Sequence, residues 1–181
     1  MSLSALPARP PLRPVELVEV DRSHRSVLEN LGQLFRHDLS ESYGLLPNDD
    51  GTFNNRPLDK FLAGEDPDRR AFLIKVAGRL GGFVLTMAAE GGGTAIDGFF
   101  VVRALRRSGV GREAALRTIA LFPGRWWIGF QRYNPGVEAF WSDVAAAAAI
   151  GEWQMHDLLP APQDRPPDTV VVFHSATPPP H

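Results

Sequence analysis

A chain of 181 residues, of which 44% are hydrophobic and 22% charged, is long enough to bury a core and form one domain, and this composition excludes an intrinsically disordered chain. The formal net charge of -2 gives no overall field that would gather nucleic acid or an anionic membrane, although it leaves local basic patches open, so a small-molecule partner is expected. The lack of cysteine excludes disulfides and cysteine nucleophiles.

The two ends of the chain are rich in proline. Residues 1–14 form a Pro-rich lead without the apolar core of a signal peptide, and residues 177–181 form a flexible tail. We therefore expect a single domain over residues 15–176. No run of 18 apolar residues occurs, which predicts a protein without a membrane span and, together with the lack of cysteine, a cytoplasmic location.

The first elements alternate between strand and helix. Residues 15–20 read as a strand, and residues 21–23 offer caps for a helix with apolar residues at helical spacing. Residues 38–46 predict a second short helix, and residues 58–62 a further helical turn. The irregular segment 38–59 is either a substrate lid or only a connection.

Three strands follow. Residues 71–76 and 82–87, joined by the turn Ala77-Gly78, predict a hairpin, because both runs are rich in β-branched and aromatic residues. The Gly91-Gly92-Gly93 turn leads to a strand over residues 95–102. The end of this strand is apolar on both faces, which predicts a central place in the sheet.

The second half of the chain predicts a βαβ unit. The strand 95–102, a helix over 111–122 and a strand over 125–130 have the required order and spacing. Pro135 lies near the first turn of the next helix, with Asn134 as its cap. Late strands are expected at 153–156 and 169–174, which complete a mixed α/β (α+β) fold.

The loop Arg106-Arg107-Ser108-Gly109-Val110-Gly111 connects the central strand to a helix. Backbone N–H groups and the positive end of the helix meet there, which favours phosphate. Gly109 and Gly111 permit unusual dihedral angles and close approach of a ligand, and the Arg side chains add charge-assisted contacts. No Gly-Lys-Ser/Thr occurs, so a Walker loop is excluded, but a different phosphate-ligand enzyme remains a third reading.

The stretch 97–144 resembles the GNAT superfamily of N-acetyltransferases in three parts. These are the apolar strand Phe99-Phe100-Val101-Val102, the loop and its helix, and Asn134 followed by Phe140-Trp141, where the family usually has Asn and then Leu-Tyr. The Phe122–Trp126 link is similar to that of an uncharacterised subgroup of predicted acetyltransferases. The resemblance implies a mixed, mostly antiparallel sheet of roughly six or seven strands flanked by about four helices.

The resemblance also implies an activity. Acetyl-CoA would donate its acetyl group to a primary amine, either of a small molecule or of a peptide N-terminus or lysine, by direct attack in a ternary complex without a metal. The N–H of Val101 would meet the thioester carbonyl and so act in catalysis. The residues expected to bind CoA are Phe100, Val101, Val102, Arg103, Arg106, Arg107, Ser108, Gly109, Val110, Gly111, Arg112, Asn134 and Trp141. Relatives often form homodimers.

The acid and base of this reaction are less well defined. Asp97 is the first candidate for the general base, and the alternative is that it faces solvent or ends a turn. Trp141 stands where the family often has a tyrosine that acts as the general acid and protonates the departing thiolate. An indole cannot donate a proton in that way. Tyr133, Ser142, His156 or water could replace it. Trp141 also motivates a competing hypothesis, a catalytically impaired module that senses acyl-CoA or serves a protein partner.

Overall fold

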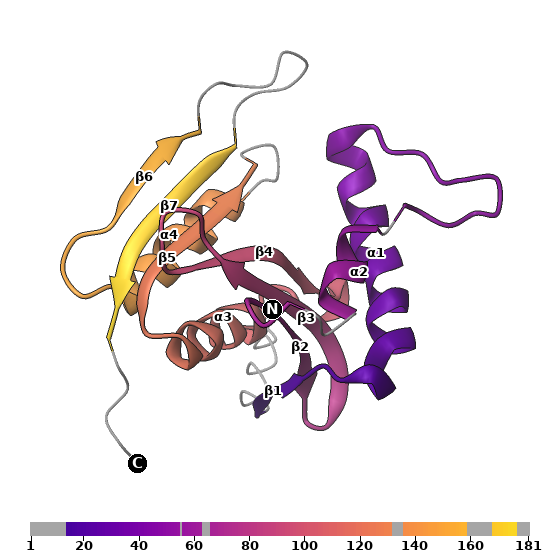
Figure 1. Cartoon of the computed structure of the whole chain (residues 1–181), viewed down its shortest axis with the longest axis horizontal. Helices are drawn as coiled ribbons and strands as arrows, with labels where there is room; N and C mark the ends of the chain where they lie inside the picture. Colours follow the sequence, from indigo (N-terminus) through magenta and orange to yellow (C-terminus); the bar gives the residue numbers. More distant parts are fainter. Residues whose placement is uncertain (1–13, 55, 63–65, 132–135, 159–167, 177–181) are drawn as a thin grey trace, which may run out of the picture.

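The computed structural model describes residues 14–54, 56–62, 66–131, 136–158 and 168–176. The elements up to the centre of the sheet are β1 (Val15–Glu19), the 3-10 turn η1 (Arg22–His24), α1 (Arg25–Tyr43), α2 (Arg56–Leu62), β2 (Arg69–Val76), β3 (Arg79–Ala88) and β4 (Thr94–Val101). The remaining elements are η2 (Arg103–Leu105), α3 (Val110–Leu121), β5 (Gly124–Phe130), α4 (Val137–Ala148), β6 (Gln154–Asp157) and β7 (Thr169–Ser175) (Figure 1).

The seven described strands form one sheet in the order β1-β2-β3-β4-β5-β7-β6. β4 lies in the middle and pairs in parallel with β5, whereas every other neighbouring pair is antiparallel. The predicted mixed, mostly antiparallel sheet with 95–102 as its central strand is therefore confirmed. The parallel pairing also confirms the βαβ unit, since α3 connects β4 to β5.

The β2–β3 hairpin turns at Ala77 and Gly78, as predicted. Both residues have positive φ, 50° for Ala77 and 74° for Gly78. Two consecutive left-handed residues form the kind of turn whose twist matches that of the flanking strands. The hairpin brings Gly82, at the start of β3, opposite Val101 at the end of β4 once the chain has returned through the Gly91-Gly92-Gly93 turn.

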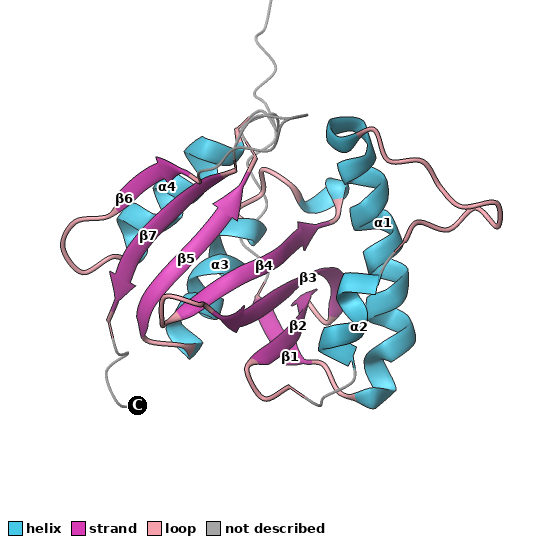
Figure 2. Ribbon diagram, turned by 45° about the horizontal axis from the view of Figure 1, so that its top comes forward, coloured by secondary structure: helices cyan, strands magenta, loops and turns pink. Residues whose placement is uncertain are grey.

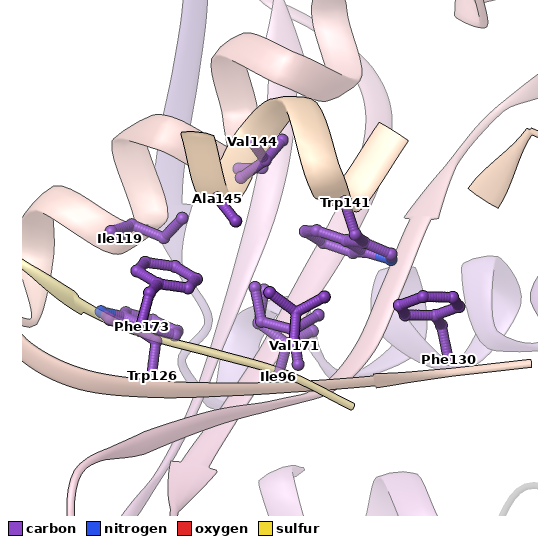
Figure 3. Packing of buried hydrophobic residues seen from close by; sticks show 11 residues of the cluster. Ile96, Ile119, Trp126, Phe130, Trp141, Val144, Ala145, Val171 and Phe173 are labelled. Atoms are coloured by element: carbon purple, nitrogen blue, oxygen red, sulfur yellow. The ribbon is translucent and has the colours of Figure 1, made fainter. Parts of the chain in front are cut away.

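Helices cover both faces of the sheet (Figure 2). On the face of α1 and α2, Phe100 of β4 packs against Phe35 and Phe83, with ring centroids 5.9 and 5.7 Å apart. On the face of α3 and α4, Trp126 of β5 is fully buried and donates from Nε1 to the carbonyl of Phe122 at 2.9 Å. Figure 3 shows this second cluster, in which Trp141 of α4 lies above the apolar side chains of β4, β5 and β7.

Two predicted element boundaries were wrong. The separate helix over 38–46 does not form, because α1 continues unbroken to Tyr43 and ends at Gly44, whose φ of 62° closes the helix in the left-handed conformation. The N-cap of α4 is Gly136, with φ 85°, instead of Asn134, which lies outside the described residues. In both places a glycine with positive φ forms the boundary of the helix.

Among the described residues, no helix has the length and the apolar character needed to cross a membrane.

Candidate acyl-CoA site

β4 pairs with β5 along only the first part of its length. It pairs with β5 only from Thr94 to Ile96, so the two strands diverge toward their carboxyl ends (Figure 2). The pairing with β3 on the other side continues to Val101. From Asp97 onward, one edge of β4 therefore no longer pairs with β5, and a strand edge of this kind can pair with another extended segment.

Val101 presents its backbone to this edge. The N–H of the next residue, Val102, donates to the carbonyl of Gly81 at 2.9 Å, so Val102 faces β3. Because backbone groups alternate in direction along a strand, the N–H and C=O of Val101 point the other way. Its side chain is buried against Val110 of α3, which fixes the residue in place.

Asp97 lies at the point where β4 leaves β5. Ile96 is opposite Thr86 and Gly98 is opposite Leu85, so Asp97 is an additional residue with no counterpart on β3. This irregularity has the form of a β-bulge, a feature that redirects side chains and ends regular pairing. Asp97 is exposed, and the structure places it on the same strand as Val101 and four positions before it.

The predicted phosphate loop turns sharply into α3. Arg107 has φ 57°, and Gly109 has φ 91° and ψ -14° as the residue before the helix. The Ser108 hydroxyl donates to the carbonyl of Leu105 at 2.5 Å and closes the turn. The first helical N–H groups have no acceptor within the helix, since the bond from Glu113 N–H to Gly109 O is the first of the series. These groups form the kind of helix end that binds anions.

Gly111 does not have the conformational role that we predicted for it. It lies within the first turn of α3 and is absent from the residues with positive φ. A Cβ atom there would meet Phe140 at 3.5 Å and Phe99 at 3.8 Å, which are ordinary contacts. Only Gly109, therefore, has a backbone conformation that requires glycine in this loop.

The arginines around the loop have protein partners. Asp38 of α1 accepts from Arg103 Nε at 3.0 Å and also bonds to the Arg106 guanidinium. Arg106 Nε donates to the carbonyl of Val101 at 2.8 Å, and its guanidinium lies 5.8 Å from the centre of the Phe100 ring. Arg103 and Arg106, both expected to bind CoA, thus also make contacts within the protein.

Two further cationic positions complete the surroundings of the loop. Arg112 pairs with Asp143 of α4 at 2.6 Å, which connects the first turn of α3 to α4. Arg107 is exposed at the tip of the turn.

The pKa of the Asp38 carboxyl is lowered. Partial burial of Asp38 acts to raise it, but hydrogen bonds and charge attraction from Arg106 and Arg103 outweigh this effect. The side chain of Asp38 is 18% exposed. Asp38 is therefore a carboxylate held ionised between two guanidinium groups, a role that no local sequence pattern indicated.

This pairing predicts a pH-dependent contribution to stability. A lowered native pKa stabilises the fold above the ordinary pKa of 3.8, and this stabilisation is lost as pH falls through the lowered value. We expect Asp38→Asn to reduce the free energy of unfolding at pH 7 by about 1–2 kcal/mol. Urea unfolding of both proteins at pH 7 and pH 3 measures this; a difference that stays constant between the two pH values would contradict it.

Trp141 is a core residue. It is 4% exposed, and its ring contacts Phe99 and Phe140 with centroids 5.3 and 4.7 Å apart. Of the alternative proton donors, Ser142 is half-buried on α4 and His156 is exposed on β6. Asn134 and Tyr133 lie outside the described residues. Within the described ranges, no group of three or more His, Asp or Glu side chains could hold a metal ion.

The side chain of Gln33 on α1 binds the segment between α1 and α2. Gln33 Nε2 donates to the carbonyl of Phe53 at 3.0 Å, and the N–H of Phe53 donates back to Gln33 at 2.6 Å. A cavity of about 530 Å³ lies beside this connection. Its lining consists of Glu29, Asn30, Gln33, Asn48, Thr52, Phe53, Asn54 and Asp59, so it is separate from the predicted CoA residues.

Comparisons with known proteins connect this geometry to one fold. No protein-family model matches the chain, and no curated protein matches it in sequence. An acetyltransferase from Thermus thermophilus is 18% identical, with a TM-score of 0.66 over 90% of this chain and 98% of the other. An aminoglycoside acetyltransferase solved with coenzyme A is 13% identical, with a TM-score of 0.63 over 89% and 95%.

A third neighbour carries the family name. An acetyltransferase of the GNAT family from Staphylococcus aureus is 11% identical, with a TM-score of 0.58 over 89% of this chain and 99% of the other. The similarity covers about nine tenths of this chain and nearly the whole of the three other proteins. The fold of this chain is the GNAT fold of the N-acetyltransferases.

Proposed function

We propose that this protein is an acetyl-CoA-dependent N-acetyltransferase that acts on a primary amine. The observation that carries the proposal is the edge of β4 that β5 leaves after Ile96 and that continues to Val101, followed in the chain by the loop into the start of α3. An extended pantetheine arm fits such an edge, and a pyrophosphate fits the helix end. The structural neighbour solved with coenzyme A supports this choice of ligand.

The strand edge and the loop would then each contribute groups to the reaction. The amine nitrogen attacks the thioester carbon, the new C–N bond forms, and the C–S bond breaks to release CoA. The N–H of Val101 would stabilise the negative charge on the carbonyl oxygen during attack. Backbone N–H groups from Arg107 to Arg112 would hold the pyrophosphate. Arg107 would add a cation at the tip of the loop.

The amine must lose a proton before or during attack. Asp97 remains our candidate for accepting it, since the bulge places an exposed carboxylate on the strand that carries Val101. The departing thiolate would take its proton from solvent, because Trp141 is buried among aromatic rings and cannot supply one. We propose amines as acceptors on the basis of this chemistry and of the neighbour whose name refers to aminoglycosides.

Calorimetry with acetyl-CoA, followed by a panel of amines with detection of free CoA thiol, tests the proposal. We expect saturable binding of acetyl-CoA and thiol release that depends on at least one amine. Failure to bind acetyl-CoA at millimolar concentration would overturn the proposal. Preference for a nucleotide over CoA would favour a different phosphate-ligand enzyme.

A second candidate function is an acyl-CoA-binding module without turnover. The burial of Trp141 favours it, because this position supplies no acid. Tight binding with no thiol release from any amine would support the module. Release of thiol with one amine would reject it.

Trp141→Tyr tests whether the position of Trp141 can supply the general acid. Tyrosine would place a hydroxyl group among Phe99, Phe140 and the β-sheet, where the smaller ring also leaves a cavity. We expect a loss of about 2–4 kcal/mol in the free energy of unfolding, and no gain in thiol release. Denaturant unfolding and the amine panel measure both quantities, and a rise in activity would show that a phenol at this position reaches the reacting atoms.

A further inference from the structure

Asp38 holds both ends of the short connection between the central strand and the phosphate loop. Its carboxylate accepts from Arg103 at the start of η2 and pairs with Arg106 directly after η2. Arg103 Nη2 lies 2.9 Å from the same carboxylate. One side chain of α1 therefore fixes the part of the chain that separates Val101 from the first turn of α3.

Arg106 extends this connection to the strand itself. Its Nε donates to the carbonyl of Val101 at 2.8 Å, while its guanidinium bonds to Asp38 and lies over Phe100. The Val101 carbonyl is on the edge that β5 has left, next to the N–H proposed to meet the thioester. Asp38, Arg106 and Val101 thus form one continuous contact from α1 to the proposed reaction centre.

The helix that carries Asp38, α1, is packed against the sheet. Leu28 and Leu31 are buried, and Phe35 packs edge-on against Phe83 at 5.5 Å. Phe35 also contacts Phe100, the neighbour of Val101. A group held on a packed helix can position a loop more accurately than a group on another loop.

We propose that Asp38 is a positioning residue for acetyl-CoA: through Arg103 and Arg106 it keeps the end of β4 and the phosphate loop in the binding arrangement, and it withholds both guanidinium groups from the pyrophosphate. This inference rests on the proposed function. It assigns the pyrophosphate to backbone N–H groups and Arg107, and it gives Arg106 a role that acts through the protein. No contact of Asp38 itself with the ligand is required.

Simple electrostatics predicts the opposite result. If Asp38 acted only by its negative charge, its removal would leave the surroundings more positive, and an anionic ligand would bind more tightly. If Asp38 positions the loop, its removal weakens binding, because the loop must then be ordered when the ligand binds. The sign of the change in affinity therefore distinguishes the two roles.

The experiment compares acetyl-CoA binding by calorimetry at pH 7.5 and 25 °C in the wild type, Asp38→Asn, Asp38→Glu and Glu41→Gln. Asparagine preserves the shape of Asp38, and Glu41→Gln removes the same charge from an exposed position on the same helix. We expect Asp38→Asn to raise Kd about 5- to 20-fold, Asp38→Glu to recover part of this loss, and Glu41→Gln to change Kd by less than about twofold. Melting curves establish that each variant is folded at 25 °C.

A double-mutant cycle adds a second measurement. Arg106→Gln should raise Kd in the wild type and have a smaller effect in Asp38→Asn, because both changes break the Asp38–Arg106 pair and only the bond from Arg106 to the Val101 carbonyl is then left to lose. Independent, additive effects would mean that Arg106 contacts phosphate directly, and would overturn the inference. So would equal or tighter binding by folded Asp38→Asn. A wild type that does not bind acetyl-CoA would instead overturn the proposed function.

Discussion

Val101→Pro should lower kcat/KM for acetyl transfer by about 100- to 1,000-fold, because it removes the N–H that would stabilise charge on the thioester oxygen. Proline is acceptable at this position since the N–H of Val101 faces away from β3, so the β3–β4 ladder keeps its bonds. Thiol release from acetyl-CoA with the best amine of the panel measures this effect.

Val101→Ala is the matched control for this substitution. It keeps the N–H but removes side-chain atoms that pack against Val110 and Ala114. We expect it to cost about 1–2 kcal/mol in the free energy of unfolding, while its loss in kcat/KM stays at least about tenfold smaller than that of Val101→Pro. If both variants lost activity equally, the packing of this strand end would matter and its N–H would not.

Gly109→Val should abolish most acetyl-CoA binding, with an increase in Kd of about 50-fold or more. The φ of 91° at Gly109 is unfavourable for a β-branched residue, so the backbone would move and the N–H groups at the start of α3 would no longer converge. We also expect a loss of about 1–3 kcal/mol in the free energy of unfolding. Calorimetry and urea unfolding measure the two quantities.

Gly78→Val introduces a similar backbone strain outside the phosphate loop. Gly78 has φ 74° in the β2–β3 turn, and a Cβ atom there would meet nothing within 4 Å. This variant should lose a similar amount of stability but bind acetyl-CoA like the wild type. Weak binding by both variants would attribute the effect of Gly109→Val to general destabilisation.

Features that depend on residues close together in the sequence could be predicted from the sequence. The apolar strand ending at Val101, the turn at Ala77-Gly78 and the strand–loop–helix sequence around Gly109 all follow from local periodicity and turn chemistry. The boundary of α1 was wrong for a related reason. Residues 38–43 contain no proline or glycine, so nothing local stops the helix before Gly44.

Features that depend on distant partners could not be predicted in this way. Asp38 meets Arg103 and Arg106 across separations of 65 and 68 residues, and nothing in the helical pattern of α1 distinguishes it from an exposed acidic residue. Trp141 could be read as a substituted catalytic position, and its burial among Phe99 and Phe140 is visible only once α4 packs on the sheet.

The sequence by itself determined the order of strands and helices and the phosphate-type loop before α3, because backbone preferences and hydrophobic periodicity act over a few residues. The tertiary structure decided that β5 stops pairing with β4 after Ile96, and that Asp38 pairs with Arg103 and Arg106, two arginines expected to bind CoA. The divergence of the strands and the choice of ion-pair partners depend on packing between elements that are far apart in the chain. Local sequence patterns therefore do not predict them.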